Sequence, residues 1–285
     1  MKAVQKVFHT NMSFPFEIEY RQRKNTDSPF HFHEWNEIVY VHEGEGTFFI
    51  DQSIQRMEKG DVFIIPGNTI HRAIPLEKTP YTITIIFFHT NLIDQRFVGD
   101  SFHLQYIFDE SRRLRQYKYR SSRRDRMKIE LFLETIITEL REKQVGYRHA
   151  IINELQALLL YLTRHVTNIN KNESHTYVGP DWMKDVLREI EEKYTEDISL
   201  SYLAKRVNIS SAHLSRVFKK MTGLNVSEYI LTKKIVKAKE LLLDADKKVI
   251  DVATQCGFES MPYFHRTFKK YTGMTPSMYR KQLKQ

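Results

Sequence analysis

Cysteine is almost absent from this chain of 285 residues, in which Cys256 is the only one. A single thiol cannot form a disulfide within the chain, which agrees with a reducing compartment. Long apolar runs are also missing, because none approaches the ~20 residues that a helix needs to cross a bilayer. The first residues lack the extended apolar core of a signal peptide. We therefore expect a cytoplasmic protein that does not contact a membrane.

Acidic residues are fewer than basic ones, and the imbalance is uneven along the chain. There are 44 Lys+Arg and 35 Asp+Glu, a net charge of +9. Residues 181–285 hold 20 basic and 13 acidic residues, whereas residues 1–180 hold 24 and 22. Basic charge concentrated in one segment is what a phosphate-binding surface needs. The hydrophobic content of 41% is ordinary for a globular protein, and the length allows two domains.

The pattern of apolar residues changes twice along the chain. Residues 1 to about 100 read as short strands rich in β-branched and aromatic residues, which is typical of a barrel or sandwich. The strand segments are "FEIEYRQR", "NEIVYVHEG", "GTFFIDQ", "GDVFIIPGN" and "YTITIIFF". Residues 101–166 then show a helical period, which predicts two antiparallel helices joined near Val145 and Gly146.

Residues 167–181 are polar, lack periodicity and end near Gly-Pro, which is a linker signal. Residues 182–285 read as helices with short turns. The sequence thus predicts an α+β multidomain protein. Its first domain, residues 1–166, has a β-barrel followed by a helical pair, and its second is an all-α domain.

The all-α segment contains an internal repeat. The stretch "LAKRVNISSAHLSRVFKKMTGLNVSEYI" begins at Leu203, and "VATQCGFESMPYFHRTFKKYTGMTPSMYR" begins at Val252. Two such copies indicate a duplicated structural unit. Seven residues recur 50 positions later: Ser210, Arg216, Phe218, Lys219, Lys220, Gly223 and Tyr229 match Ser260, Arg266, Phe268, Lys269, Lys270, Gly273 and Tyr279.

Each copy has the pattern of a helix-turn-helix. A short amphipathic helix leads into a turn that contains Asn208 or Gly257, residues that tolerate positive φ. Ser210 or Ser260 can cap the next helix. That helix is apolar on one side and basic on the other, so it suits the major groove, with its N-terminal part against base edges.

Residues 225–243 read as one helix between the two copies, about 28 Å long at 1.5 Å per residue. A rod of that length could hold the two basic helices about one DNA turn apart, ~34 Å, on one face of the duplex.

The last hundred residues also carry a family signature. The stretch "KKVIDVATQCGFESMPYFHRTFKKYTGMTPSMYR" resembles that of the AraC/XylS family of bacterial transcription regulators. The resemblance implies two helix-turn-helix units on one linking helix, with double-stranded DNA as the partner. The family's base-reading positions fall on Ala212, Ser215, Arg216, Pro262, Tyr263, His265 and Arg266.

Three more residues on the same helix faces are candidate DNA contacts: His213, Lys219 and Lys269. Arginine reads guanine bidentately, and lysine meets phosphate. Ala212 and Pro262 are poor hydrogen-bond donors, so we expect them to contact only a thymine methyl group or a sugar.

The N-terminal segment resembles a cupin barrel. The stretch "HFHEWNEIVYVHEG" fits the first cupin motif and "GDVFIIPGNTIH" fits the second, although Asn68 replaces a usual glycine and Pro75 a usual asparagine. The metal-ligand positions of metal-binding cupins are filled here by His31, His33, Glu37 and His71. Residues two apart on a strand face the same way, so we expect His31 and His33 to converge, with His71 arriving from across the barrel.

Three interpretations of this group stay open. It can hold a divalent transition metal (Fe, Mn, Ni, Zn or Cu), and the sequence does not choose among these. It can bind a small-molecule effector by hydrogen bonds alone, or it can be inherited scaffold. Regulators with cupin arms commonly bind small metabolites, so we expect a carbohydrate effector. Nearby aromatic residues that could stack on a sugar are Phe30, Phe32, Trp35, Tyr40 and Phe48.

The helical segment at residues 101–166 resembles the part through which such regulators form homodimers. Its apolar residues Leu155, Leu158, Leu159 and Leu162 could pack against a second copy or against their own barrel. The basic run at residues 111–126 is more typical of a solvated face or loop than of an additional DNA contact.

From these features we expect a ligand-responsive transcriptional regulator rather than an enzyme. It would bind repeated promoter half-sites as a homodimer, with the linker passing the signal to the DNA-binding domain, and would contact RNA polymerase if it activates, as most relatives do. The alternatives are a metal-dependent cupin enzyme, such as a dioxygenase or isomerase, a metal sensor with a DNA-binding arm, or a constitutive architectural DNA binder.

Overall fold

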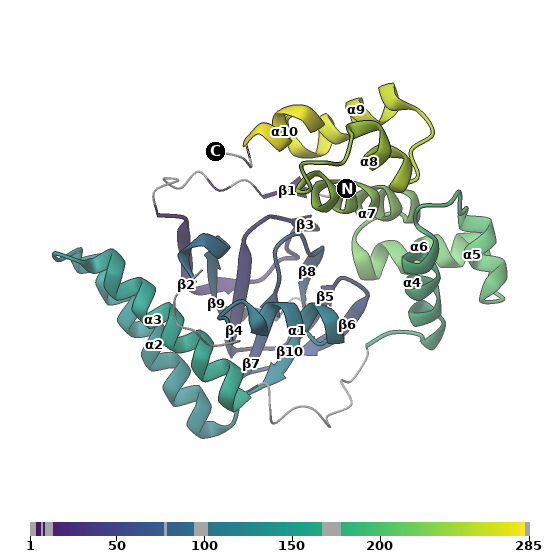
Figure 1. The fold of residues 1–285 in the computed structure, drawn as a ribbon. Coiled ribbons are helices and arrows are strands. Elements are labelled where there is room, and N and C mark those ends of the chain that lie inside the picture. The colour runs from purple at the N-terminus through teal and green to yellow at the C-terminus, as the bar shows by residue number, and fades with distance from the viewer. Residues whose placement is uncertain are drawn as a thin grey trace.

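The computed structural model describes residues 4–6, 8, 14–76, 79–93, 102–166 and 178–282. Strands dominate the first part of the chain and helices the rest (Figure 1). The strands are β1 (Val4–Gln5), β2 (Phe16–Lys24), β3 (His31–Phe32), β4 (Asn36–Glu43), β5 (Gly46–Ile50), β6 (Ser53–Met57), β7 (Asp61–Ile65), β8 (His71–Pro75), β9 (Tyr81–Phe88) and β10 (Lys118–Arg120).

The helices follow in three groups. A 3-10 turn (Thr90–Leu92) and α1 (Tyr106–Leu114) follow the strands up to β9. The helical pair is α2 (Arg123–Glu142) and α3 (Tyr147–Tyr161), which continues as a π-helical turn (Leu162–Val166). The C-terminal domain consists of α4 (Asp181–Lys193), α5 (Leu200–Arg206), α6 (Ser211–Thr222), α7 (Val226–Leu242), α8 (Val249–Gln255), α9 (Met261–Thr272) and α10 (Pro276–Gln282).

The strands form two five-stranded sheets. Sheet A has the order β1-β3-β8-β5-β6, and sheet B has the order β10-β7-β4-β9-β2. The β1–β3 pair is parallel, and the other pairs are antiparallel. Apolar side chains of both sheets, among them Phe48 of β5 and Phe63 of β7, meet in one cluster between the sheets. This confirms the predicted N-terminal β domain.

The outer face of each sheet is covered by helices. Ile38, Ile64 and Ile86 of sheet B pack against α1, α2 and α3. Phe32 and Phe49 of sheet A share a cluster with the helices of the C-terminal domain. In Figure 1 the helical pair and the C-terminal domain accordingly lie on opposite sides of the strands. Burial on both faces explains why β4 and β7 read as nearly continuous apolar runs.

Five short strands went unrecognised in the sequence: β1, β3, β6, β8 and β10. The basic run at residues 111–126 is also not the simple solvated face or loop that we expected. It spans the end of α1, the strand β10 paired with β7, and the start of α2. Tyr119 of this strand and Tyr117 directly before it are both buried, each in a different apolar cluster.

The predicted helical pair is confirmed. Ser122 and Asp125 form a capping box at the start of α2, and the connection to α3 contains Gly146 with φ of 85°. Four leucines of α3 and the turn that follows are at most 1% exposed within this one chain: Leu155, Leu158, Leu159 and Leu162. They pack on sheet B and α2, which is the second of the two uses expected for this stripe.

The two helix-turn-helix units are confirmed in detail. Ser210 and Ser260 cap α6 and α9 by accepting hydrogen bonds from backbone N–H groups. Asn208 (φ 55°) and Gly257 (φ 72°) occupy the turns in the left-handed region. Residues 226–242 form one helix, α7, with a capping box at Asn225.

The predicted linker, residues 167–181, lies mostly outside the described residues. Of its described part, Val178 donates a backbone hydrogen bond to Ile54 of β6 at 3.0 Å, and Asp181 already belongs to α4.

Within the described part of the chain, every helix is too short or too polar to serve as a membrane span.

Candidate functional sites in the barrel and the helix-turn-helix units

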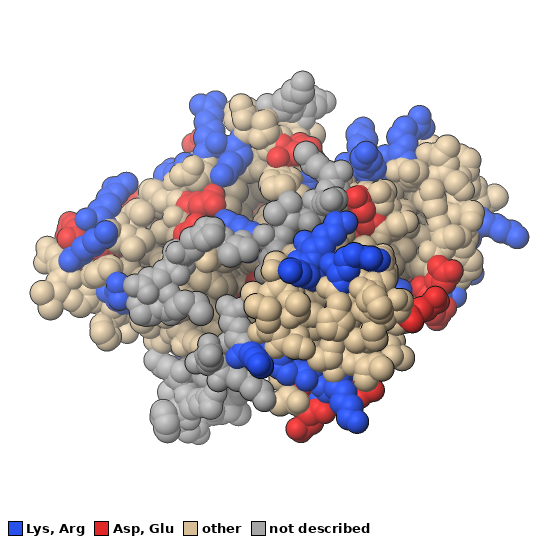
Figure 2. Space-filling model, turned by 90° about the horizontal axis from the view of Figure 1, so that it is seen from above, with Lys and Arg blue, Asp and Glu red and all other residues tan. Residues whose placement is uncertain are grey.

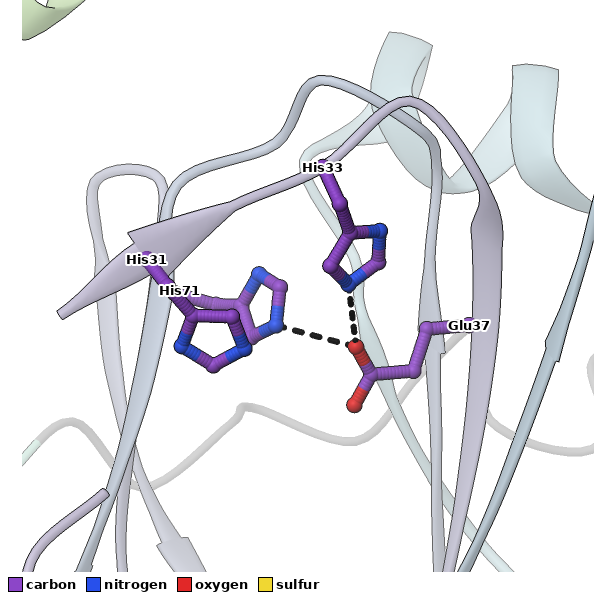
Figure 3. Close-up of side chains that lie close together, drawn as sticks. All are labelled: His31, His33, Glu37 and His71. Carbon is purple, nitrogen blue, oxygen red and sulfur yellow. Dashed lines mark hydrogen bonds and ion pairs between the residues drawn. The ribbon is translucent and has the colours of Figure 1, made fainter. Parts of the chain in front are cut away.

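The four candidate ligand residues of the barrel converge (Figure 3). One nitrogen of each histidine and one Glu37 oxygen all lie within 4.8 Å of one another. His31 sits on β3, His33 directly follows it, His71 is on β8 and Glu37 is on β4. His31 pairs directly with His71 on the adjacent strand. It is therefore Glu37, and not His71 as expected, that approaches from the opposite sheet.

Backbone carbonyl groups determine which nitrogen of each of the three imidazole rings carries a hydrogen. Nδ1 of His31 lies 2.7 Å from the Pro29 carbonyl oxygen, and Nδ1 of His33 lies 2.8 Å from that of Trp35. Nδ1 of His71 lies 2.9 Å from the Thr69 carbonyl oxygen. A carbonyl only accepts, so each Nδ1 must carry the hydrogen. In the neutral form each Nε2 then presents a lone pair toward the cluster.

These lone pairs face a carboxylate that also accepts hydrogen bonds. His33 Nε2 lies 2.8 Å and His71 Nε2 lies 2.9 Å from the same oxygen of Glu37. His71 Nε2 makes no hydrogen bond among the described residues. A neutral imidazole Nε2 and a carboxylate oxygen are both hydrogen-bond acceptors, so they cannot form a hydrogen bond with each other. The short contacts to Glu37 therefore require either additional protons on the imidazole rings or a bound cation.

Electrostatics oppose protonation of part of this cluster. Burial, with the neighbouring His71, holds the pKa of His31 well below its usual value. Burial also lowers the pKa of His33, although Glu37 acts in the opposite sense. Burial alone would raise the pKa of Glu37, yet His71 and His33 hold it well below its ordinary range. An ionised carboxylate surrounded by imidazole nitrogens is a donor set that suits a divalent transition metal.

The cluster opens into a cavity of about 390 Å³ between the sheets. His31, Glu37 and His71 form part of its wall, whereas His33 lies behind them. The remaining wall is mostly apolar, and polar residues lie toward β2 and the segment after it. The apolar lining residues are Pro29, Val39, Phe48, Ala73, Tyr81, Ile83, Ile85 and Phe87, and the polar ones are Lys6, Glu19, Lys24, Thr26, Asp27 and Ser28.

Of the five aromatic residues proposed to stack on a ligand, Phe48 alone lines this cavity. Phe30 and Phe32 point to the other side of sheet A, Trp35 stacks on Phe8, and Tyr40 donates to Glu130 of α2. Tyr81 and Phe87 of β9 were missed. The alternation in "YTITIIFF" carries the signal, because it places Tyr81, Ile83, Ile85 and Phe87 on one face.

The second candidate site consists of the basic faces of α6 and α9. Arg216 and Lys219 of α6, and Arg266 and Lys269 of α9, are exposed. Figure 2 looks down on the side where α9 and α10 lie in Figure 1, and separate groups of Lys and Arg stand out from this face. Both arginines are positioned by a neighbour on their own helix: Arg216 donates to His213 at 3.1 Å, and Arg266 lies over the ring of Tyr263.

The other predicted contacts lie on the same helix faces. Ala212, Pro262 and Tyr263 are exposed, and Ser215 and His265 are half-buried. His213 is also half-buried, next to Trp182 of α4 with ring centroids 5.8 Å apart. The apolar side of each helix is buried, as expected: Leu214, Phe218, Phe264 and Phe268 are all inaccessible to solvent.

Two family models match the chain. A cupin domain model matches residues 19–87, and a helix-turn-helix domain model matches residues 203–282. A Staphylococcus aureus protein named an uncharacterized HTH-type transcriptional regulator is 28% identical over 269 residues, or 92% of this chain. The chain spans about a third of the length of that relative (34%). The Msm operon regulatory protein of Streptococcus mutans is 24% identical over 86% of this chain and 84% of its own length.

Solved structures also resemble parts of the chain. The C-terminal domain of a two-component response regulator from Fusobacterium nucleatum is 40% identical over 35% of this chain and 99% of its own, with a TM-score of 0.34. ToxT from Vibrio cholerae is 13% identical over 95% of this chain and 100% of its own, with a TM-score of 0.37.

Proposed function

Because this chain belongs to the AraC/XylS family and carries a cupin domain ahead of its two helix-turn-helix units, we propose that it is a DNA-binding transcriptional regulator controlled from the barrel cavity. It binds repeated promoter half-sites as a homodimer and activates transcription through contact with RNA polymerase. The observation that carries this proposal is the repeat itself: two capped helices, α6 and α9, each with an exposed arginine and lysine at equivalent positions.

The linking helix supports a joint contact with one duplex. α7 has 17 residues, which corresponds to about 26 Å at 1.5 Å per residue. With the widths of the flanking helices added, this length suits a separation near one DNA turn, ~34 Å. Each protomer would then enter two consecutive major grooves, and a dimer would require two copies of the half-site.

Alanine variants test the DNA contacts. We expect Arg216→Ala and Arg266→Ala each to weaken binding by about 1–3 kcal/mol and to relax base choice at one position. Lys219→Ala should weaken binding to all sequences and flatten the salt dependence. Arg141→Ala, at the exposed far end of α2, is the matched control. Gel shifts with a duplex selected from a randomised pool measure these effects. Parent-like binding by the Arg216→Ala/Arg266→Ala double variant would refute the assignment.

The barrel is proposed to hold a divalent transition metal at His31, His33, Glu37 and His71. Support comes from the three Nδ1–carbonyl contacts, which leave the Nε2 lone pairs free for a metal, and two of these nitrogens lie within 2.9 Å of one Glu37 oxygen. When bound, the metal would supply a Lewis-acidic centre at the cavity wall. The protein's own residues orient the ligand atoms and leave the cavity side open to an effector.

A carbohydrate is the effector class that we propose. The cavity provides aromatic rings at Phe48, Tyr81 and Phe87 for the apolar face of a sugar. Charged groups at Lys24 and Asp27 can hydrogen-bond its hydroxyl groups. A thermal-shift screen of sugars, with and without divalent metals, tests this proposal. Stabilisation by none of them would favour the constitutive DNA binder or the inherited scaffold.

The metal-dependent cupin enzyme remains the second candidate, because the same cluster faces a ligand-sized cavity. Metal analysis of protein purified without a histidine tag discriminates between the two. A stoichiometric redox metal together with turnover of a small molecule would support the enzyme. Reversible metal binding that alters DNA affinity without turnover would support the regulator.

A further inference from the structure

The strands that hold the histidines turn alternate side chains toward the helix-turn-helix domain. On β3, His31 faces the cavity, and Phe32 faces α7, where Lys239 Nζ lies 5.1 Å from its ring centroid. On β5, Phe49 packs against Tyr229 of α7 with ring centroids 6.0 Å apart. Successive residues of a strand point to opposite faces. The strands of sheet A therefore contact the cavity on one side and α7 on the other.

A largely buried ion pair joins the turn after β5 to α7. Lys233 Nζ donates to Asp51 Oδ1 at 2.8 Å, and the Tyr229 hydroxyl donates to the Asp51 carbonyl oxygen, also at 2.8 Å. Glu191 of α4 is a second anionic partner of Lys233. Burial would lower the pKa of this ammonium group, but Asp51, Tyr229 and Glu191 hold it well above its usual value. Lys233 thus stays charged and anchored.

A second ion pair joins the loop of the histidine cluster to the same helix. Lys239 has no exposed surface, and its Nζ lies 3.0 Å from Glu34 Oε1. Glu34 directly follows His33 and precedes Glu37 by three residues. The segment between the candidate metal ligands His33 and Glu37 is therefore tied to α7.

Together these two ion pairs, Asp51–Lys233 and Glu34–Lys239, form what we call the α7 clamp. Their lysines are six residues apart, about 9 Å along the helix. α7 lies between the two units and contacts α6, α8, α9 and α10. Breaking a buried ion pair leaves an uncompensated charge at a high cost. When the segment that bears Glu34 moves relative to the turn that bears Asp51, we expect α7 to tilt and to keep both ion pairs.

We propose that the α7 clamp carries the signal from the barrel cavity to both helix-turn-helix units. This inference rests on the proposed regulatory function and differs from the linker route expected from the sequence. His33 and Glu37 lie on either side of Glu34 in the sequence and, with His31 and His71, would hold the metal, so a change in their positions on binding would move Glu34 and, through Lys239, α7. A ligand changes the affinity for DNA only if it binds two conformations of the protein with different affinities. The α7 clamp would make the position of α7 differ between these two conformations.

The test compares three full-length proteins: the parent, the double variant Asp51→Asn/Lys233→Met, and Lys237→Met. The double variant removes both charges of one pair, and asparagine suits the positive φ of residue 51, 54°. Lys237 is the matched control, because it lies on α7 but pairs with Glu240 of the same helix at 3.2 Å. None of these substitutions alters the histidine cluster, so calorimetry should give one Zn²⁺ affinity for all three proteins.

Hydrogen–deuterium exchange of the α7 amides, with and without Zn²⁺, measures the clamp in the absence of DNA. We expect Zn²⁺ to change α7 exchange in the parent and in Lys237→Met, and to change it less in the double variant, which keeps the Glu34–Lys239 pair but lacks the second anchor of α7. An unchanged Zn²⁺ response in the double variant would overturn the α7 clamp as the signal route. So would the absence of any α7 response in a parent that has bound Zn²⁺. A parent that binds no Zn²⁺ would overturn the metal site and this route from it.

DNA binding then tests the proposed function separately. Affinity for a duplex selected by the parent from a randomised pool is measured with and without Zn²⁺. We expect a change of about 5-fold or more in the parent and in Lys237→Met, and less than about 2-fold in the double variant. A parent that selects no duplex contradicts the proposed function, whereas the exchange result concerns the clamp alone. If the double variant no longer unfolds cooperatively, Glu34→Gln/Lys239→Met replaces it, with the same expected results.

Discussion

Gly223 and Gly273 occupy equivalent places at the ends of α6 and α9. Comparing the alanine variant at one position with that at the other distinguishes the cost of backbone strain from the cost of losing a contact between the domains. Both glycines have positive φ, 83° and 79°. A methyl group at position 223 would meet the guanidinium group of Arg72 on β8, whereas one at position 273 would meet no described atom within 4 Å. The internal repeat thus provides a matched control for the contact between the barrel and the end of α6.

The structure sets the expected size of each effect. A left-handed conformation costs an L-residue about 1–2 kcal/mol, and this is the whole expected cost of Gly273→Ala. Gly223→Ala must also displace Arg72, which donates to the Ser28 carbonyl oxygen at 3.2 Å and pairs with the half-exposed carboxylate of Asp27. A hydrogen bond contributes about 1 kcal/mol and an exposed pair about 0.2–1 kcal/mol. We therefore expect Gly223→Ala to cost about 2–4 kcal/mol.

Urea unfolding followed by circular dichroism measures both costs. The comparison is repeated in an Arg72→Ala background, where the two alanines should cost the same within about 0.5 kcal/mol. The transition analysed must be the one in which the helical domain unfolds, because a protein of two domains need not unfold in one step. Equal costs in the parent background would show that Arg72 does not contact the end of α6 in solution, and the domain contact described here would be wrong.

Three further predictions concern single side chains. Glu37→Gln should reduce Zn²⁺ affinity, measured by calorimetry, by more than the ~10–100-fold that loss of an outer-shell partner costs, whereas Glu43→Gln, exposed on the same strand, should leave it unchanged. Burial raises the pKa of Cys256 to about 12, so a thiol reagent at pH 8 should label it only after unfolding, and rapid labelling of the native protein would contradict this burial. Burial also holds the pKa of His42 at about 4, below the usual ~6.5. The unfolded chain therefore binds a proton in this range that the native protein does not, so the free energy of unfolding should fall from pH 6.5 to pH 4. His42→Gln should reduce that fall, and an unchanged slope in the urea-derived values would refute the assignment.

The helix-turn-helix units were predictable because their signals are local. Ser210 caps the α6 backbone three residues away, and Asn208 and Gly257 adopt the left-handed conformation themselves. Such features depend on neighbours within one or two turns of chain. The repeat adds a second copy of each signal, so the two units support each other.

The barrel was only partly predictable. The long strands β2, β4 and β9 carry enough β-branched and aromatic residues to be recognised, whereas β3 has two residues and β10 has three. The sequence placed His31, His33, Glu37 and His71 in one group through its resemblance to cupin motifs. It did not show that His31 pairs with His71, because strand register depends on which strands become neighbours.

By itself, the sequence determined the local elements, the two helix-turn-helix copies and the residue types available for metal, ligand and DNA. Only the tertiary structure decided what covers each apolar face. It placed the leucines of α3 against their own barrel, turned Phe32 away from the cavity toward α7, and brought Asp51 to Lys233 across 182 positions of chain. The physical reason is that a burial pattern shows which side chains leave water, but not which partner excludes it.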